Sequence, residues 1–235
     1  AAGALDEVNN IIKPGISTSE IDKLCYEFIN DHKAFSAPLY YRGYPKSCCT
    51  SSNHVVCHGI PSEKILNDGD ILNVDVTAIK DGWHGDTSRM FVVGQCSVKA
   101  KKLIKTTYEA MMEAIKIIKA HTKIGNIGYT IQKLVEAEGF SVVRDFCGHG
   151  IGKKFHESPN VLHYGEKNSG QELKDGMIFT VEPMINYGKF ETKTLKDGWT
   201  AVTKDKSLSA QFEHTVGVTK EGYEIFTLSK KGLNF

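Results

Sequence analysis

Four acidic residues interrupt segments of the sequence that are otherwise apolar and typical of β-strands. They are Asp75, Asp86, Glu182 and Glu213. The first two flank the Asp81-Gly82 turn of a hairpin expected over residues 68–94, so antiparallel pairing would place them nearly opposite each other, where like charges repel. Acids buried in a sheet must be paired, protonated or bound to a metal ion. These residues therefore indicate a cation held between strands.

A fifth donor of a different type lies in the segment FCGHGIGKKFHESP, residues 146–159, where His149 stands between two glycines that let the backbone approach closely. Four negative charges balance two divalent cations, and carboxylates with a single imidazole suit Mn, Fe, Co or Zn in a two-metal hydrolytic site. Taken singly, each acid is more often an exposed edge residue or an ion-pair partner, and His149 is as often a satisfied core histidine as a ligand. Five such residues in apolar settings favour the metal site.

Composition narrows the class of protein. The chain has 235 residues with 40% hydrophobic content, enough for a large core in one big domain or two small ones. A formal net charge of +1 argues against a nucleic-acid surface, and no apolar run reaches the length of a membrane span. The six cysteines lack CxxC spacing, which suits a reducing cytoplasm. The sequence starts at Ala1 within a helical pattern and without an initiator Met, so we expect a truncated N-terminal helix.

Helices are expected in two pairs, each followed by strand-like segments. The first helix ends near residue 12, and the capping-box sequence Ser17-x-x-Glu20 begins a second that runs to about His32. Amphipathic patterns predict two further helices, over residues 98–120 and 126–138. Strand-like segments dominate the remainder of the chain.

This order suggests an internal repeat. The segment LNDGDILNVDV from Leu66 aligns with LKDGMIFTVEP from Leu173 and sets Asp75 against Glu182. A second match, at another constant offset, aligns the segment from Gly15 with that from Gly125. We therefore expect two pseudo-equivalent halves, approximately residues 1–96 and 97–235, each with two helices and a sheet that carries acids to a central point.

Five ordered motifs closely resemble those of the type I methionine aminopeptidases, and the resemblance covers essentially the whole chain. The motifs are HGIP at 58–61, NVDVTAIKDGWHGDTSRMF at 73–91, CGHGIGKKFHESP at 147–159, FTVEPMI at 179–185 and QFEHTVGVT at 211–219. The resemblance implies an α/β (α+β) pita-bread fold, in which two pseudo-symmetric halves of helices and antiparallel strands surround a dinuclear metal site. Residues 1–235 would form one catalytic domain. The resemblance also implies a ligand set for two divalent metal ions: Asp75, Asp86, His149, Glu182 and Glu213, with Asp86 and Glu213 as the bridging ligands.

The same resemblance implies roles around the metals. Glu182 would shuttle a proton as well as bind metal, and His58 and His156 would contact the substrate and stabilise the tetrahedral intermediate. The pocket for the first side chain would be lined by Tyr41, Tyr44, Cys49, Phe155 and Trp199. A slot of aromatic rings and sulfur suits an unbranched thioether, although such residues are more often plain core. Pro38 departs from many bacterial relatives, which often carry Cys there.

The implied activity is removal of the initiator methionine from nascent proteins with a small second residue, by a cytoplasmic and monomeric hydrolase. Lysines at 99, 101, 102 and 105 could face the ribosome, but a solvated helix face is the simpler account. An Xaa-Pro dipeptidase would need a large extra N-terminal domain, and a type II enzyme would need an insert that the interval from His156 to Glu182 has no room for. A third alternative is a fold relative that has lost its metal and only binds partners. The intact ligand set argues against it.

Overall fold

The computed structural model describes residues 1–234, in which four α-helices and one short 3-10 helix are joined by many short strands. The helices are α1 (Ala2–Ile11), α2 (Thr18–Asp31), η1 (Tyr41–Gly43), α3 (Val98–Lys116) and α4 (Gly125–Ala137). The predicted capping box is present at the start of α2, where the Ser17 and Glu20 side chains each bond the other's backbone N–H. None of the helices over residues 1–234 is both long and apolar enough to cross a membrane.

Helix α3 ends earlier than the sequence pattern predicts, at Lys116 instead of about residue 120. The backbone N–H groups of Ala120 and His121 donate to the carbonyls of Thr219 and Leu173, at 3.2 and 2.9 Å. Because these bonds connect the chain to the strand region, they replace the bonds that would have continued the helix.

The largest sheet has nine strands, and its main path runs β1-β4-β5-β14-β9-β7-β8, with β2 paired to β4 and β15 paired to β14. Its strands are β1 (Phe35–Ser36), β2 (Cys49–Ser52), β4 (Ile71–Lys80), β5 (Trp83–Val92), β7 (Gly148–Gly150), β8 (Glu157–Val161), β9 (Ile178–Val181), β14 (Glu213–Val218) and β15 (Tyr223–Ile225). Neighbouring strands on this path are antiparallel, and the contact between β5 and β14 joins the first part of the chain to the second.

Two smaller sheets lie beside the large one. One has the order β13-β10-β6 and the other β11-β12-β3. Their strands are β3 (Val55–Cys57), β6 (Ser141–Val142), β10 (Met184–Asn186), β11 (Thr192–Thr194), β12 (Ala201–Thr203) and β13 (Ser209–Gln211). The mixture of helices and antiparallel strands matches the α/β (α+β) class predicted from the sequence.

The predicted hairpin is the longest regular pairing in the sheet. Strands β4 and β5 have ten residues each and turn at Asp81 and Gly82, whose φ angles of 53° and 79° fit a tight two-residue turn. The register sets Thr77 opposite Asp86 and Ser88 opposite Asp75, so the two acids are diagonal neighbours, not the nearly opposite pair that the sequence suggested. A diagonal arrangement keeps both on one face of the sheet.

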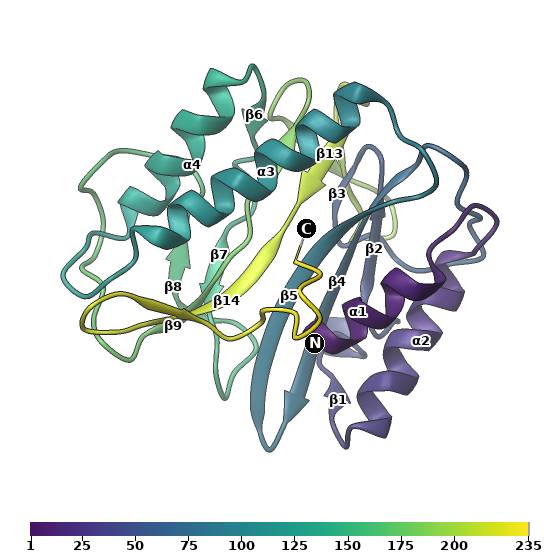
Figure 1. The fold of residues 1–235 in the computed structure, drawn as a ribbon, viewed down its shortest axis with the longest axis horizontal. Helices are drawn as coiled ribbons and strands as arrows, with labels where there is room; N and C mark the ends of the chain where they lie inside the picture. The colour runs from purple at the N-terminus through teal and green to yellow at the C-terminus, as the bar shows by residue number, and fades with distance from the viewer. Residues whose placement is uncertain (235) are drawn as a thin grey trace.

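The helices cover one face of the large sheet, as Figure 1 shows: α1 and α2 lie over the β4–β5 hairpin, and α3 and α4 lie over the part around β14 and β9. Alternate residues of β4, Leu72, Val74 and Val76, enter the core cluster that contains residues of α1 and α2. Phe179 and Val181 of β9 enter the cluster with α3 and α4. Because strand side chains alternate between faces, the acids between these apolar residues point to the opposite face.

Two backbone connections of the first part of the chain have counterparts in the second part. Ser17 bridges to Ile65 just before α2, and Lys123 bridges to Glu172 just before α4. The turn before β4 donates from Gly69 N to Val93 O, and the turn before β9 donates from Gly176 N to Val218 O. These bridges make Lys123 the counterpart of Ser17, so the sequence match between Gly15 and Gly125 is about one helical turn out of register.

The C-terminal segment, residues 226–234, returns to the first helix. Ser229 Oγ donates to Asp6 Oδ2 at 2.9 Å, and Lys231 Nζ lies 2.7 Å from Glu7 Oε1. Thr227 Oγ1 lies 2.9 Å from His214 Nδ1 and accepts from the Thr215 N–H at 3.1 Å. The last residues therefore join α1 to β14, and Figure 1 shows both termini near the middle of the helical face.

Candidate metal centre and substrate pocket

One row of side chains crosses the sheet through the candidate metal site. Backbone pairing sets Asp75 of β4 opposite Ser88 of β5, and Ser88 opposite Glu213 of β14. Side chains directly opposite one another point to the same face, so the acids at the two ends of this row face each other over Ser88. Asp86 lies two residues from Ser88 along β5 and shares that face.

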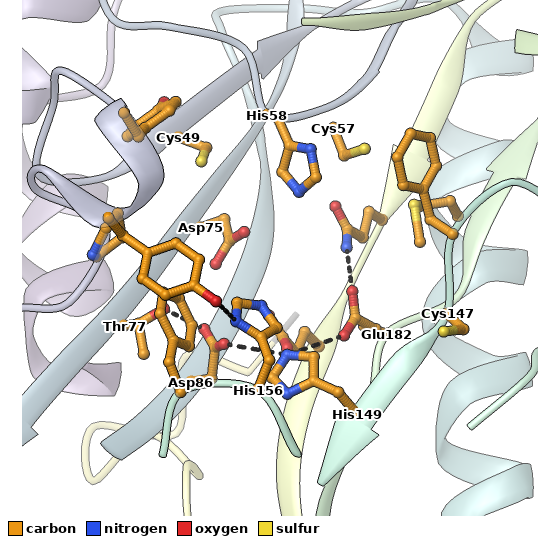
Figure 2. Close-up of a pocket in the computed structure, with 18 of the residues that line it drawn as sticks. Cys49, Cys57, His58, Asp75, Thr77, Asp86, Cys147, His149, His156 and Glu182 are labelled. Atoms are coloured by element: carbon orange, nitrogen blue, oxygen red, sulfur yellow. Dashed lines mark hydrogen bonds and ion pairs between the residues drawn. The ribbon is translucent and has the colours of Figure 1, made fainter. Parts of the chain in front are cut away.

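Two more donors come from the second half of the chain. His149 lies on β7 and Glu182 directly follows β9; His149 Nε2 is 3.7 Å from Asp86 Oδ2 and 3.6 Å from Glu182 Oε1. Donor atoms of Asp86, His149 and Glu213 all lie within 4.8 Å of one another. Figure 2 shows Asp75, Asp86, His149 and Glu182 directed into one space. The structure thus brings together all five residues predicted as metal ligands.

Threonine hydroxyls fix the orientation of these donors. Thr77 Oγ1 donates to Asp86 Oδ1 and Thr180 Oγ1 donates to Glu182 Oε1, both at 2.7 Å. The Thr180 hydroxyl also accepts from the His149 N–H at 3.0 Å, so it connects two candidate ligands. Thr215 Oγ1 accepts a hydrogen bond from the Asp86 N–H at 3.0 Å and donates one to the Asp86 carbonyl at 2.7 Å. Such bonds hold carboxylates in place before a metal arrives.

Burial makes the charged forms of these acids unfavourable in the metal-free protein. Burial, followed by the neighbouring acids, raises the pKa of Asp75 and of Glu213 well above the usual range. Burial also raises the pKa of Asp86, although His149 opposes the shift, and it raises the pKa of Glu182 to about 7. The acids therefore cannot all ionise near neutral pH unless a cation joins them.

The donor set fits divalent cations. Among the residues that the structure describes, the imidazole of His149 is the one paired with these acids, at 3.7 Å from Asp86 Oδ2 and 3.6 Å from Glu182 Oε1. The protein itself therefore supplies far too little positive charge for four carboxylates. Carboxylate oxygens with one nitrogen donor suit Mn, Fe, Co or Zn, the metals expected from the sequence. The need for external positive charge and the convergence of the donor atoms therefore both indicate a site for divalent cations.

A cavity of about 550 Å³ opens beside the acids and contains all the residues predicted to bind substrate. These residues are Tyr41, Tyr44, Cys49, His58, Phe155, His156 and Trp199, and Pro38 also lines the wall. The Tyr44 and Trp199 rings meet edge to face with their centroids 5.1 Å apart. The Tyr44 hydroxyl lies 3.0 Å from Cys48 O and 3.1 Å from Gly59 O, so its proton is shared between two backbone carbonyls. The Tyr44 side of the slot therefore presents an apolar ring.

The two outer histidines stand on different sides of the acids, as Figure 2 shows. Burial lowers the pKa of His58, whose ring meets the Phe146 ring edge-on with the centroids 5.5 Å apart. Burial, followed by the charge of His149, lowers the pKa of His156 to about 3. His156 Nδ1 lies 3.0 Å from the Tyr41 hydroxyl oxygen. Both rings are therefore neutral near pH 7 and can act as hydrogen-bond donors or acceptors.

Sequence reasoning missed several residues of the site. Cys57, Phe146, Cys147, Met184 and Gln211 also line the cavity. The supporting threonines carried a signal that could have found them, since each lies two positions from an acid and shares its strand face. These threonines are Thr77, Thr180 and Thr215.

The sequence matches the model of metallopeptidase family M24 over residues 1–220. The chain belongs to that family. It is similar to the methionine aminopeptidase of Rickettsia prowazekii, at 56% identity over 100% of this chain and 91% of the relative. A methionine aminopeptidase of Escherichia coli strain K12 is 55% identical over 98% of this chain and 88% of the relative. The crystal structure of the Rickettsia protein superposes with a TM-score of 0.96 at 57% identity, and the match covers 97% of this chain and 92% of the other.

Among M24 peptidases, the chain belongs with the methionine aminopeptidases. The pita-bread fold predicted from the motifs is confirmed by the match to a solved member. The predicted enzyme class is confirmed as well: an M24 protein is a metal-dependent hydrolase, and this one has a cluster of donors suited to divalent cations.

Proposed function

We propose that the protein removes the N-terminal methionine from nascent polypeptides and prefers chains with a small second residue. This proposal rests on one observation: two features lie in the same cavity of about 550 Å³. Uncompensated buried acids lie at one side, and an aromatic and sulfur-lined slot lies beside them. The first can bind the metals of a peptidase, and the second can select the side chain to be removed.

Two divalent cations would be held by Asp75, Asp86, His149, Glu182 and Glu213. Bound divalent cations supply Lewis-acid chemistry, since they polarise a carbonyl group and make water a stronger acid. Full ionisation of the acids would follow from that added charge, because the pKa of each is raised chiefly by burial without a counter-ion.

We assign Glu182 the transfer of a proton. Thr180 fixes its Oε1 at 2.7 Å, whereas its Oε2 has only a long contact of 3.4 Å from Gln211 Nε2. The less constrained oxygen can accept a proton from attacking water and return it to the leaving amine. A pKa near 7 in the metal-free protein indicates how readily this carboxylate holds a proton in its buried setting.

His156 and His58 would support the tetrahedral intermediate from the two sides of the acids. The Tyr41 hydroxyl oxygen lies 3.0 Å from His156 Nδ1. We assign the hydroxyl as the donor of this pair, which leaves the imidazole proton on Nε2 and available to the substrate. The neutral state of both rings near pH 7 lets them donate without placing a repelling charge beside the substrate amine. Preorganised donors of this kind stabilise charge that develops in the transition state.

The slot would hold the methionine side chain. Tyr44 presents a ring whose hydroxyl is already engaged, Trp199 meets it edge-on, and Cys49 adds sulfur. A straight thioether gains dispersion and sulfur-to-ring contacts in such a setting, whereas a lysine would lose hydration. His58 and His156 both line the cavity, and we expect them to limit the space beyond the scissile bond, so a small second side chain should fit best.

The test is release of the first residue from matched tripeptides under one fixed divalent metal. Met-Ala and Met-Gly peptides should be cleaved efficiently, and Leu- or Lys-initiated peptides should be cleaved far more slowly. Norleucine carries a methylene in place of the methionine sulfur. Its peptide should be cleaved at a rate within about 10 to 200-fold of that of the Met peptide, the usual limit for discrimination between side chains that differ this little. Similar rates for Met, Leu and Lys would indicate a broad aminopeptidase, and preference for Pro over Ala at the second position would indicate an Xaa-Pro peptidase. Chelator-treated protein is the control.

We also propose that the enzyme acts in the cytoplasm as a monomer on chains that emerge from the ribosome. The lysines of α3 do not single out a ribosomal surface, since Lys102 lies 3.0 Å from Glu138 and Lys105 lies 3.7 Å from Glu109. Lys99 packs over the Tyr187 ring at 5.6 Å. These contacts favour a solvated helix face. Co-sedimentation with ribosomes, compared between the wild type and a Lys101→Glu variant, tests the surface directly.

A further inference from the structure

The segment that joins β7 to β8 carries two residues of the pocket without regular secondary structure of its own. It begins after His149 and Gly150, and it places Phe155 and His156 just before Glu157 starts β8. Phe155 and His156 stack with ring centroids 4.1 Å apart, and His156 lies 4.2 Å from the His149 ring. The position of this segment therefore decides where two candidate substrate contacts lie.

The tip of the β4–β5 hairpin contacts that segment through His84. The carbonyl of Gly152 accepts two bonds from the same residue, from the His84 N–H at 2.8 Å and from the His84 ring Nδ1 at 2.9 Å. The His84 ring also stacks on Phe155, with the centroids 5.7 Å apart and the planes 18° from parallel. One side chain thus contacts both the start of the segment and its aromatic residue.

The neighbouring residue reinforces the contact. A methyl group added at Gly152 would lie 3.5 Å from the Trp83 ring, so the segment packs closely on the hairpin tip. Lys153 Nζ lies 5.4 Å from the centroid of the Trp83 ring. Neither contact reaches Phe155, which leaves His84 as the residue that connects the hairpin to the aromatic wall.

We propose that His84 is a positioning residue, which holds Phe155 and His156 in the places they need to bind the substrate. Its Nδ1–H fixes the Gly152 carbonyl, and its ring stacks on Phe155. Because the Phe155 and His156 rings are in contact, with centroids 4.1 Å apart, a shift of the first displaces the second. Misplacement of a reacting or binding group by about 1 Å can cost 10²-fold in rate.

Three substitutions separate the two contacts. His84→Asn keeps a donor near the position of Nδ1 but has no ring, and His84→Phe keeps the ring but has no donor. His84→Ala removes both. Asp81→Asn is the matched control, because it changes the same hairpin three residues before His84 and Asn accepts the positive φ of 53° there.

The trypsin sensitivity of the metal-free protein tests the role of His84 without bound metal or catalytic turnover. Lys153 and Lys154 are exposed within the segment, so cleavage there, followed by mass spectrometry, measures how often the segment opens. Loss of one hydrogen bond should raise the cleavage rate by up to about tenfold in His84→Ala and in His84→Phe. His84→Asn and Asp81→Asn should remain within about twofold of the wild type. Equal cleavage of His84→Ala and the wild type would overturn the inference.

Kinetics on the metal-loaded enzyme supply the second readout, and this part rests on the proposed function. His84→Ala should lower kcat/KM for a Met-Ala peptide by up to about 10²-fold and reduce the preference for Met over Leu. A merely structural role would lower the fraction of active enzyme and leave KM and that preference unchanged, which would contradict the proposal. An inactive wild type would refute the proposed function instead, while the trypsin measurement would still judge His84.

Discussion

Two sets of buried residues differ in how the negative charge of their carboxylates is balanced. The balanced set is Asp6 with its partners Arg89 and Ser229, and the unbalanced set is the acid cluster Asp75, Asp86, Glu182 and Glu213. Asp6 of α1 is 3% exposed, and its oxygens meet Arg89 Nη2 at 3.0 Å and the Ser229 hydroxyl at 2.9 Å. Glu213 is equally buried at 2% exposure, yet its charged neighbours are chiefly other acids. The first set carries its own cation within the protein. The second lacks one.

Strand β5 carries both arrangements, which makes the comparison informative. Arg89 pairs with Val74 on the face that α1 covers, whereas Asp86 points to the open face. The same strand therefore contributes to a closed ion pair on one side and an unbalanced acid cluster on the other. A buried acid whose partner is internal serves the fold, and one whose partner must come from outside can serve a ligand.

The largest expected effect comes from the unbalanced set. Asp86→Ala or Glu213→Ala should lose bound metal together with activity, on the order of 10³-fold or more, since metal-ion catalysis supplies several kcal/mol of transition-state stabilisation. Metal content by mass spectrometry and peptide turnover on the same samples measure both losses. Retention of full metal content by both variants would remove the basis of the comparison.

The two outer histidines, His58 and His156, should not be needed for metal binding. His58→Ala and His156→Ala should keep their metal, while kcat falls by roughly 10²-fold, as is typical when a donor to the transition state is lost. Turnover and metal analysis, run beside Asp86→Ala, test this division. If His58→Ala lost metal as Asp86→Ala does, His58 would belong to the ligand set.

The balanced set should respond in stability, not in metal binding. Asp6→Ala leaves Arg89 without its partner and should lower the free energy of unfolding by about 3–5 kcal/mol. Urea unfolding of the metal-free protein measures the change, and activity per folded molecule should remain close to that of the wild type.

A double substitution sharpens the contrast. Asp6→Leu with Arg89→Met removes both charges and should recover most of the lost stability. Glu213→Gln, by contrast, relieves repulsion and should stabilise the metal-free protein. A destabilised metal-free Glu213→Gln variant would contradict the view that the acid cluster lacks an internal partner.

The smallest effect is a pH dependence of the metal-free protein. Burial raises the folded-state pKa of Glu182 from 4.5 to about 7 and raises that of Glu213 well above its usual range. The folded state then binds more protons than the unfolded state, so stability should fall as pH rises from about 6.5 to about 8.

Buried histidines act in the opposite direction at lower pH. The pKa of His163 is lowered to about 3 and that of His214 to about 4, so stability from these groups rises up to about pH 6.5 and then stays constant. Urea midpoints above that pH, compared between the wild type and Glu213→Gln, therefore report on the acids. Glu213→Gln should flatten the decline, and identical slopes for both proteins would assign the decline to other groups.

Much of this comparison could be predicted from the sequence. Asp75, Asp86, Glu182 and Glu213 were detectable because an acid within an apolar strand lacks a local reason. His149 was detectable as a nitrogen donor between two glycines, and the motif resemblance then implied all five as ligands of two metal ions. The internal partner of Asp6 could not be predicted, since Arg89 and Ser229 are far away in the chain and meet only in the folded protein. Register also escaped sequence reasoning: the diagonal placement of Asp75 and Asp86 depends on a two-residue turn whose pairing the sequence left open.

The return of the C-terminal segment to α1 has a consequence for the order of events during synthesis. Ser229 completes the bonds of Asp6, and Thr227 bonds the backbone of β14 beside Glu213. While residues 227–231 are still inside the ribosomal tunnel, the first helix and the last long strand lack these contacts. We expect a stalled nascent chain that exposes only residues 1–226 to be digested more readily at α1 than the released protein. The first helix and β14 would thus gain these contacts only when residues 227–231 have left the tunnel.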